Sequence, residues 1–420
     1  MMRANQSQQK PDEILSVPVF GRAVVIGSGI AGLTMARVLS RYVAELVIVE
    51  RDSSAGESGT RPGVPQAHHP HNLHPQGQQI LEAQFAGITE DLLADRAVSM
   101  GEPGDIAFHY AGGWHMARTD SRRPVLACSR ALLERHLLRR LQADERIQIR
   151  YATEVAGLYT DSSGARVGGL FLRSRGRNGG GEVALDAEIV VDASGRRSRA
   201  PEWLAALGFP APEEWRIDAQ VGYVSRVYQR PASFDEGWKM LYIRPTPPEH
   251  TRGGIITPLE GDRWHVGLIG VGRDYPPMEE AKFLDYARSL PVLELYEAIR
   301  EAQPLTRLYG FRGADNRVRR YDRLPRYLEG FLVAGDAAYA LNPVYAQGMT
   351  AAVLAGQALD EALRSHPGLA SGDIAGLSRR FQEALSEAVE GPWRQATRTD
   401  WRWPLTEVMD NTELLVGPWD

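Results

Sequence analysis

The chain has 420 residues, of which 43% are hydrophobic and 24% are charged, and its formal net charge is −5. This composition is typical of a globular enzyme, and the weakly acidic balance gives no reason to expect a nucleic-acid partner. The length exceeds what one hydrophobic core usually supports, so several sub-structures are expected.

The sequence also limits the cellular context of the protein. Cys128 is the single cysteine, so no internal disulfide can form, and a reducing compartment fits. Residues 1–18 are polar, have no apolar core of signal-peptide length and are predicted to form a flexible arm. Because no apolar run reaches about 18 residues, no membrane span is expected. We therefore expect a cytoplasmic protein.

The first strong pattern is a strand, a glycine-rich turn, a helix and a second strand. Residues 22–26 form an apolar, β-branched run, the pattern G-x-G-x-x-G follows at 27–32, and residues 45–50 form the next strand. Gly27 allows the tight turn, Gly29 lets a pyrophosphate approach the backbone, and Gly32 lets helix and strand pack closely. Glu50 ends the second strand, where it can accept the ribose hydroxyls and would repel a 2′-phosphate. This context predicts a dinucleotide-binding βαβ unit.

Further elements alternate along the chain. Helices are expected at residues 77–85, 129–142, 278–302 and 347–364, and also over the last 50 residues. Ser129 is the expected N-cap of the second helix. Single strands are expected at 147–159, 166–173, 183–192 and 330–335. Between them, Gly/Pro turns separate strands typical of an antiparallel sheet at 219–229, 239–245, 253–259 and 263–272.

Two more motifs each come directly after a predicted strand. Asp192-Ala193-Ser194-Gly195 comes after the strand at 183–192. Gly335-Asp336 comes after the strand at 330–335 and is followed by the sequence NPVYAQGMT at 342–350. Each motif alone could be an ordinary turn at a strand end.

With these three motifs in this order, the chain resembles the FAD monooxygenases that include para-hydroxybenzoate hydroxylase, squalene epoxidase and the flavin epoxidases of polyketide pathways. The resemblance extends from about residue 20 to 405 and is closest to the epoxidase branch. It implies an α/β fold: a Rossmann-like FAD-binding domain of the GR2 type, an inserted antiparallel-sheet substrate domain and C-terminal helices. The epoxidase branch usually has glycine where this chain has Ala346, whose methyl group would narrow the space over the flavin or shift the loop that precedes the helix.

The resemblance, together with the element pattern, predicts the domain organisation. The FAD-binding domain is expected to be discontinuous, at residues 19–85, 115–205 and 325–365. The substrate domain is expected at 86–114 and 206–324, and a C-terminal helical segment at 366–420.

The resemblance also predicts which residues hold FAD. The first motif would bind the ADP half, the aspartate of the Gly335-Asp336 pair would hold the ribityl chain, and the helix after it would point its N-terminus at the flavin. The predicted cofactor-binding residues are Gly27, Gly29, Ile30, Ala31, Gly32, Glu50, Arg51, Arg61, Arg130, Val155, Asp192, Gly195, Gly335, Asp336, Pro343, Gln347, Gly348, Met349 and Thr350.

Four histidines lie in one short loop, at His68, His69, His71 and His74. No cysteine or acidic ligand accompanies them, and Pro70 and Pro75 would break a helix that aligned them, so we expect no metal site. Imidazoles titrate near neutrality and can move protons. The catalytic residue itself is undetermined; the candidates are His69, His71 and Tyr345.

We hypothesise that reduced FAD reacts with O2 to form a C4a-hydroperoxide, which epoxidises or hydroxylates a hydrophobic natural-product intermediate. Because the sequence has a single dinucleotide fingerprint, electrons would come from transient NAD(P)H or from a partner flavin reductase. A chamber on the inserted sheet is expected near Tyr223, Tyr228, Trp238, Tyr242, Ile255 and Trp264. Alternatives are a flavin-dependent halogenase, an FAD-dependent reductase or dehydrogenase of a prenyl-type substrate, and a non-catalytic dinucleotide-binding partner.

Overall fold

The computed structural model describes residues 18–54, 61–117, 122–175 and 181–409. Nearly all of the predicted N-terminal arm and the last eleven or so positions of the predicted C-terminal segment lie outside these ranges. Within them, no helix is both long and apolar enough to cross a membrane.

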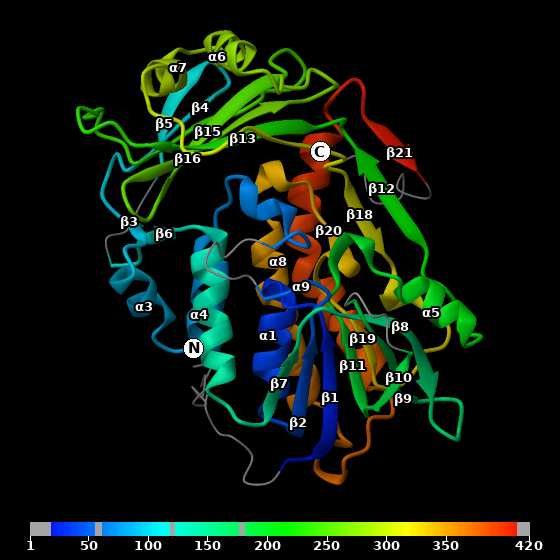
Figure 1. The fold of residues 1–420 in the computed structure, drawn as a ribbon. Helices are drawn as coiled ribbons and strands as arrows, with labels where there is room; N and C mark the ends of the chain where they lie inside the picture. Colours follow the sequence, from blue (N-terminus) through cyan, green and yellow to red (C-terminus); the bar gives the residue numbers. More distant parts are fainter. Residues whose placement is uncertain (1–17, 55–60, 118–121, 176–180, 410–420) are drawn as a thin grey trace, which may run out of the picture.

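A five-stranded parallel sheet forms the centre of the larger body (Figure 1). Its apolar, β-branched strands are buried on both faces, as expected for central parallel strands. The strand order is β19 (Phe331–Val333), β11 (Ile189–Asp192), β1 (Phe20–Ile26), β2 (Val43–Val49) and β7 (Ile147–Arg150). The predicted α/β class is therefore confirmed.

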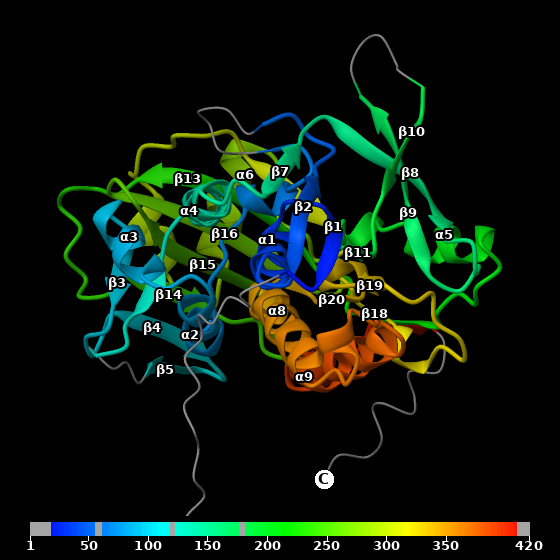
Figure 2. The same ribbon diagram turned by 90° about the horizontal axis from the view of Figure 1, so that it is seen from below.

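Helices cover one face of this sheet and a small antiparallel sheet covers the other (Figure 2). The helical layer consists of α1 (Ile30–Leu39), α4 (Arg130–Gln142), α8 (Gly348–Arg364) and α9 (Leu377–Asp400). Helix α4 starts where predicted, because the Ser129 hydroxyl accepts a hydrogen bond from the Leu132 N–H. The opposite layer consists of β8 (Thr153–Thr160), β9 (Val167–Ser174) and β10 (Val183–Asp186).

Two predicted single strands are each divided in two. The segment 147–159 breaks after β7 at Ala152, which has a φ of 48° and donates its N–H to Asp52 O at 2.8 Å. The segment 183–192 breaks between β10 and β11, where Ala187 N–H bonds to Gly168 O and Glu188 N–H bonds to Arg22 O. In both cases the chain leaves one sheet and enters another, which hydrophobicity alone does not reveal.

A seven-stranded, mostly antiparallel sheet lies across the top of Figure 1. Its strands are β17 (Tyr309–Arg312), β13 (Gly222–Gln229), β16 (Arg263–Gly270), β15 (Arg252–Leu259), β14 (Met240–Ile243), β4 (Ile106–Tyr110) and β5 (Gly113–Met116), in that order. Helices α6 (Glu280–Arg288) and α7 (Glu294–Ile299) pack on its outer face. Strand β4, from the first predicted segment of the substrate domain (86–114), thus joins the strands of the second segment (206–324) in one sheet. The boundaries of the predicted domains stay a prediction.

A four-stranded sheet lies between the part built on the five-stranded sheet and the part built on the seven-stranded sheet. It contains β20 (Tyr339–Ala340), β18 (Asn316–Arg319), β12 (Glu214–Asp218) and β21 (Glu407–Met409). Strand β21 corrects the expectation that the C-terminal segment is helical throughout, because its backbone pairs with β12. The remaining elements are α2 (Pro75–Gln84), α3 (Ile88–Ala94), α5 (Ala200–Ala206), β3 (Val98–Met100) and β6 (Val125–Ala127).

The close approach of α1 to β1 depends on two glycines. A Cβ at Gly32 would lie 1.9 Å from the carbonyl oxygen of Gly27, so no larger residue fits there. Gly27 itself has a φ of 97° and faces the Ala193 carbonyl oxygen, 2.7 Å from where its Cβ would be. A Cβ at Gly29, in contrast, would meet nothing within 4 Å.

This contrast gives a matched test. We expect Gly32→Ala to lower the free energy of unfolding by roughly 3 kcal/mol, because the added methyl group must push α1 off β1. Gly29→Ala, which adds the same methyl group in open space, should leave the stability of the cofactor-free protein nearly unchanged. Urea unfolding of both variants measures this. Equal stabilities would contradict the packing role of Gly32.

Candidate functional site

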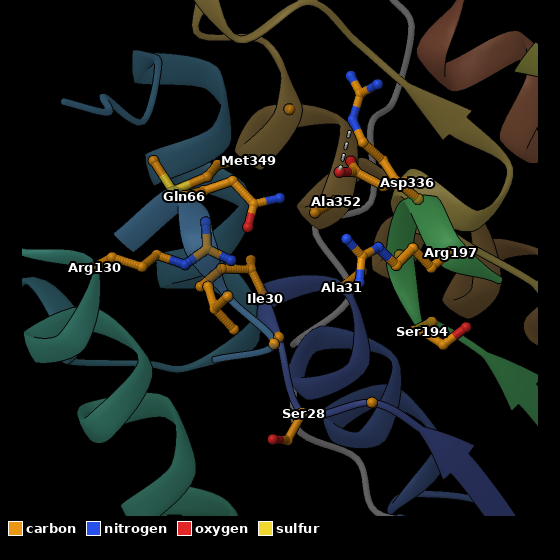
Figure 3. A pocket seen from close by; sticks show the side chains of 18 of the residues that line it. Ser28, Ile30, Ala31, Gln66, Arg130, Ser194, Arg197, Asp336, Met349 and Ala352 are labelled. Atoms are coloured by element: carbon orange, nitrogen blue, oxygen red, sulfur yellow. Dashed lines mark ion pairs between the residues drawn. The ribbon is translucent and has the colours of Figure 1, made fainter. Parts of the chain in front are cut away.

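A cavity of about 340 Å³ runs along the carboxyl ends of the central strands to the start of α8 (Figure 3). Its size lies within the usual range of small-molecule sites, roughly 300–1,000 Å³. Most predicted cofactor residues line it: Gly27, Gly29, Ile30, Ala31, Glu50, Arg51, Arg130, Val155, Gly195, Asp336, Pro343, Gly348 and Met349. The others lie behind the lining: Gly32, Arg61, Asp192, Gly335, Gln347 and Thr350.

Three glycines leave open space on the cavity wall. Cβ atoms built at Gly29, Gly195 and Gly348 would each meet nothing within 4 Å. Gly29 caps α1 without a side-chain hydrogen bond, and the first turn of that helix carries no acidic residue. The N–H groups at this helix start are therefore available for an anion, as in dinucleotide sites.

A chain of buried ion pairs closes one end of the cavity. Arg61 contacts Glu50 at 2.8 Å and Glu134 at 2.7 Å, and Arg130 contacts Glu134 at 2.7 Å. Burial raises the pKa of Glu50, but the Arg61 cation and hydrogen bonds from Ser28 and Asp52 outweigh it and hold that pKa below its usual value. Glu50 thus stays anionic at neutral pH. Ser28 and Arg61 already occupy one oxygen, Oε2, of the carboxylate that was expected to accept the ribose hydroxyls.

Glu134 is a residue that the sequence analysis missed. It holds both predicted cofactor arginines, Arg61 and Arg130, and it is nearly buried on α4. Its spacing of four from Arg130 was a weak signal, since such pairs are also common on exposed helix faces. Arg130 points into the cavity in Figure 3, so Glu134 fixes the direction of a cation that faces the ligand space.

The Asp192 motif shapes a turn rather than presenting its carboxylate. Asp192 is fully buried and accepts hydrogen bonds from Ser194 N at 2.9 Å and Ser198 Oγ at 2.6 Å. The cavity instead receives Gly195, which has a φ of 82°, and the side chain of Arg197, which points inward in Figure 3. Arg197 was not among the predicted site residues.

Asp336 lines the cavity, as Glu50 and Glu154 do. It follows Gly335, whose φ of 60° and contact with Ala31 bring the turn against α1. Arg196 Nε lies 3.9 Å from Asp336 Oδ2, and burial raises the pKa of this carboxyl group (Figure 3). An acceptor at this position can hold a ligand hydroxyl group.

The start of α8 presents backbone and sulfur to the cavity. Gly348 and Met349 line it, whereas Gln347 donates its side-chain amide to Gln395 Oε1 at 2.8 Å and lies behind the lining. Thr350 is buried, and its hydroxyl has no partner among the described residues. The helix start therefore offers N–H groups without a competing acidic side chain.

The loop before α8 is fixed by a buried carboxylate at the end of α9. Asp400 accepts hydrogen bonds from Asn342 Nδ2 at 3.0 Å, from Asn316 Nδ2 at 2.6 Å and from the hydroxyl group of Tyr345. Because Tyr345 points to Asp400 and does not line the cavity, its placement argues against the catalytic role suggested for it. Ala346 ends this loop in the left-handed region, with a φ of 53°.

The four loop histidines point in different directions. His68 stacks on Tyr309 at 4.0 Å, His69 Nδ1 lies 2.9 Å from Ser225 Oγ, and His74 Nε2 lies 3.4 Å from Tyr345 O. Among the residues that the structure describes, no group of side chains could hold a metal ion.

His69 and His71 do line the cavity, as the two remaining catalytic candidates. Burial lowers the pKa of His69 to about 3 and that of His71 to about 4. Both imidazoles are therefore neutral at physiological pH and act as hydrogen-bonding groups rather than as cations. Nε2 of His71 has no partner among the described residues.

The predicted substrate chamber is divided by the seven-stranded sheet. Tyr228, Trp238 and Trp264 pack on its outer face with α6 and α7, so their assignment to the chamber is corrected. The alternation of side chains along a strand explains this, since neighbouring residues face opposite sides. Tyr223 and Tyr242 belong to the inner cluster, and Ile255 alternates with the outward-facing Ile256.

An aromatic wall remains at the sheet end of the cavity. Tyr223 and Phe311 stack with ring centroids 5.3 Å apart, and both line the cavity. His69 meets Tyr223 edge-on at 4.6 Å. Leu341 and Pro343 add further apolar side chains to the cavity lining. One cavity therefore combines a polar, glycine-rich end with an apolar, aromatic end.

Comparison with known proteins agrees with this arrangement. Residues 22–366 match the family model described as an FAD binding domain. A protein from Mycobacterium tuberculosis, Protein Rv3254, is 30% identical over 369 residues, which cover 84% of this chain and 75% of that protein.

Solved structures share the fold at lower identity. p-Nitrophenol 4-monooxygenase PnpA from Pseudomonas putida is 18% identical with a TM-score of 0.65, covering 92% of this chain and 88% of that one. The myxobacterial chondrochloren halogenase CndH is 17% identical with a TM-score of 0.66, covering 91% and 82%. A mutant of PqsL from Pseudomonas aeruginosa is 17% identical with a TM-score of 0.64, covering 91% and 97%.

The buried Asp400 carboxyl predicts a pH dependence of stability. Burial raises its pKa from 3.8 to about 7. Between these values the folded state keeps a proton that the unfolded state has lost, so this contribution to stability falls as pH rises from about 4 to 7. Between about pH 4 and 7, the free energy of unfolding of the wild type should fall by roughly 1–4 kcal/mol relative to that of Asp400→Asn.

Urea unfolding at a series of pH values checks this. Asp235→Asn, at an exposed position, is the matched control and should follow the wild type. A constant difference between the wild type and Asp400→Asn across the window would contradict the prediction.

Ala346, whose backbone is in the left-handed region, gives a second test of stability. Ala346→Gly should raise the free energy of unfolding by about 1 kcal/mol, because glycine adopts a positive φ without a steric penalty. Ala388→Gly, inside α9, should instead lower it by about 1 kcal/mol. Calorimetry of both variants measures the two signs, and a loss of stability in Ala346→Gly would refute the strain argument.

Proposed function

The chain belongs to the family of FAD-binding-domain proteins and is an FAD-dependent oxidoreductase, and from that premise we propose that it is a monooxygenase acting on a hydrophobic small molecule. The observation that supports this most is the continuity of one cavity from the open glycines to the aromatic wall. A cofactor and an apolar substrate can therefore meet inside the same cavity.

The residues of the polar end fit FAD. The open wall at Gly29 and the uncapped start of α1 suit the pyrophosphate, and Asp336 suits a hydroxyl group of the ribityl chain. Gly348 leaves room for a flat ring system at the start of α8, where the helix N–H groups favour negative charge. Arg130 adds a cation to the same space.

Bound FAD supplies the oxygen chemistry: once reduced, it provides two electrons with which, together with two protons, one atom of O2 becomes water while the other enters the substrate. The protein's own contribution is orientation and exclusion of water. Tyr223 and Phe311 offer a flat apolar surface against which a planar substrate can stack. His69 and His71 bring no positive charge to this end at neutral pH.

Both hydroxylation and epoxidation of a natural-product intermediate agree with such a chamber. Electrons would come from NADH or NADPH that visits the cavity, or from a separate flavin reductase. We expect the enzyme to work in the cytoplasm.

Binding and reduction of FAD test the proposal. The purified protein should show the absorption bands of an oxidised flavin, and Gly29→Ala should weaken FAD binding at least tenfold, which corresponds to about 1.4 kcal/mol. Fluorescence titration of the cofactor-free proteins measures this, with Ala388→Gly as a control at a position that does not line the cavity. Failure to bind FAD would refute the proposed function.

The reaction itself is tested with candidate apolar substrates and reduced FAD. Substrate-dependent incorporation of one atom of 18O from labelled O2 supports a monooxygenase. Incorporation of bromide or chloride instead would indicate a halogenase, and a reduced or dehydrogenated product without incorporation of 18O would indicate a reductase or dehydrogenase.

A further inference from the structure

A second, smaller cavity lies beside the start of α8, among α2, α3 and α4. Its volume is about 30 Å³, and apolar side chains dominate its lining. They include Leu81 of α2, Leu92 of α3, Leu133 of α4 and Met349 of α8. All four side chains are buried, so the space lies within the packed interior of the helical layer.

The polar groups around this cavity are almost all satisfied. Gln78 donates to Pro124 O at 3.0 Å and accepts from Leu126 N at 3.1 Å, and the Thr89 N–H donates to Glu82. His71 Nε2 is the exception, because it has no partner among the described residues.

The size and polarity of the small cavity indicate what kind of molecule it can bind. About 10–15 Å³ of such volume holds one water molecule, so the space is large enough for a molecule of one or two heavy atoms. A buried water needs two to four polar partners. Of the polar side chains in this lining, His71, Gln78 and Thr89, only His71 has a buried atom that lacks a partner among the described residues. A small apolar molecule loses no hydrogen bonds on entering and is the better match.

The cavity adjoins the main site. His71 and Met349 line both cavities, so these two side chains form the partition between them. Methionine has three rotatable bonds and changes rotamer readily, which lets it open a passage without moving the backbone. A molecule held in the small cavity is thus one side chain away from the start of α8.

We infer that this cavity is a binding site for dioxygen that feeds the main cavity. The inference rests on the proposed function, because a monooxygenase consumes O2 at that site. Without substrate the balanced reaction is the oxidation of reduced FAD: two electrons and two protons pass from the flavin to O2, which gives oxidised FAD and H2O2.

Xenon tests the cavity without reference to flavin. It is apolar, larger than O2, and visible in diffraction. Crystals of the protein under xenon pressure should show a xenon atom in contact with Leu81, Leu133 and Met349. An ordered water bonded to His71 Nε2 in place of xenon would overturn the inference.

Paired variants test the supply of O2. Leu92→Phe fills the small cavity, whereas Leu93→Phe adds the same side chain at the neighbouring position, which is 40% exposed and does not line the cavity. In stopped-flow oxidation of the reduced, FAD-loaded proteins, Leu92→Phe should lower the second-order rate constant with O2 about fivefold, equivalent to about 1 kcal/mol in the barrier. Leu93→Phe should match the wild type.

Two further controls keep the outcomes distinct. Cys128, just before α4, lines the same cavity, so Cys128→Leu also fills it. If Leu92→Phe folds poorly, Cys128→Leu should show the same decrease in the rate constant with O2. FAD affinity is measured for every variant and should not change. A normal oxidation rate with the cavity filled would overturn the inference and leave the proposed function intact. Failure of the wild type to bind FAD would refute the proposed function, while the xenon experiment would still report on the cavity.

Discussion

The position of α1 on β1 is the constraint on which the rest of the site depends. The helix can approach the strand this closely only because Gly32 has no side chain in front of the Gly27 carbonyl group. The same approach places the first turn of α1 at the carboxyl edge of the parallel sheet, where β2 and β11 also end. Asp336 joins this edge through the contact of Gly335 with Ala31. One steric condition therefore gathers three motifs from distant parts of the sequence.

Buried charge fixes the two ends of the cavity in different ways. At one end, Glu134 shares its carboxylate between Arg61 and Arg130, so that each cation is compensated where water is scarce. Near the other end, Asp400 accepts hydrogen bonds from the neutral side chains of Asn316, Asn342 and Tyr345, and it has no cationic partner among the described residues. The first arrangement orients charge toward a ligand, whereas the second holds a loop in place.

The apolar end follows a different principle. Its wall is built from rings and aliphatic groups, and the histidines beside it are kept neutral by burial. Apolar walls and neutral side chains suit reactive oxygen chemistry, because loose protons and water would divert it. The small cavity beyond Met349 adds a second, mostly apolar space next to this end.

The sequence by itself determined the local features of this protein. The glycine pattern at 27–32, the strands around it, the cap at Ser129 and the helix at 348–364 depend on neighbouring residues, so they could be predicted closely. Most of the lining at the polar end of the cavity followed from the same motifs.

Only the tertiary structure decided what depends on contacts between distant segments. Tyr223 and Tyr228 lie on the same strand but face opposite sides of the sheet. Which of them faces the site therefore depends on which side α6 and α7 cover. Glu134 became part of the site because Arg61, far from it in sequence, folds against α4. Tyr345 was drawn away from the cavity by Asp400, a partner on another helix. Such pairings are set by packing and burial, whose free energies depend on the whole fold rather than on any local pattern.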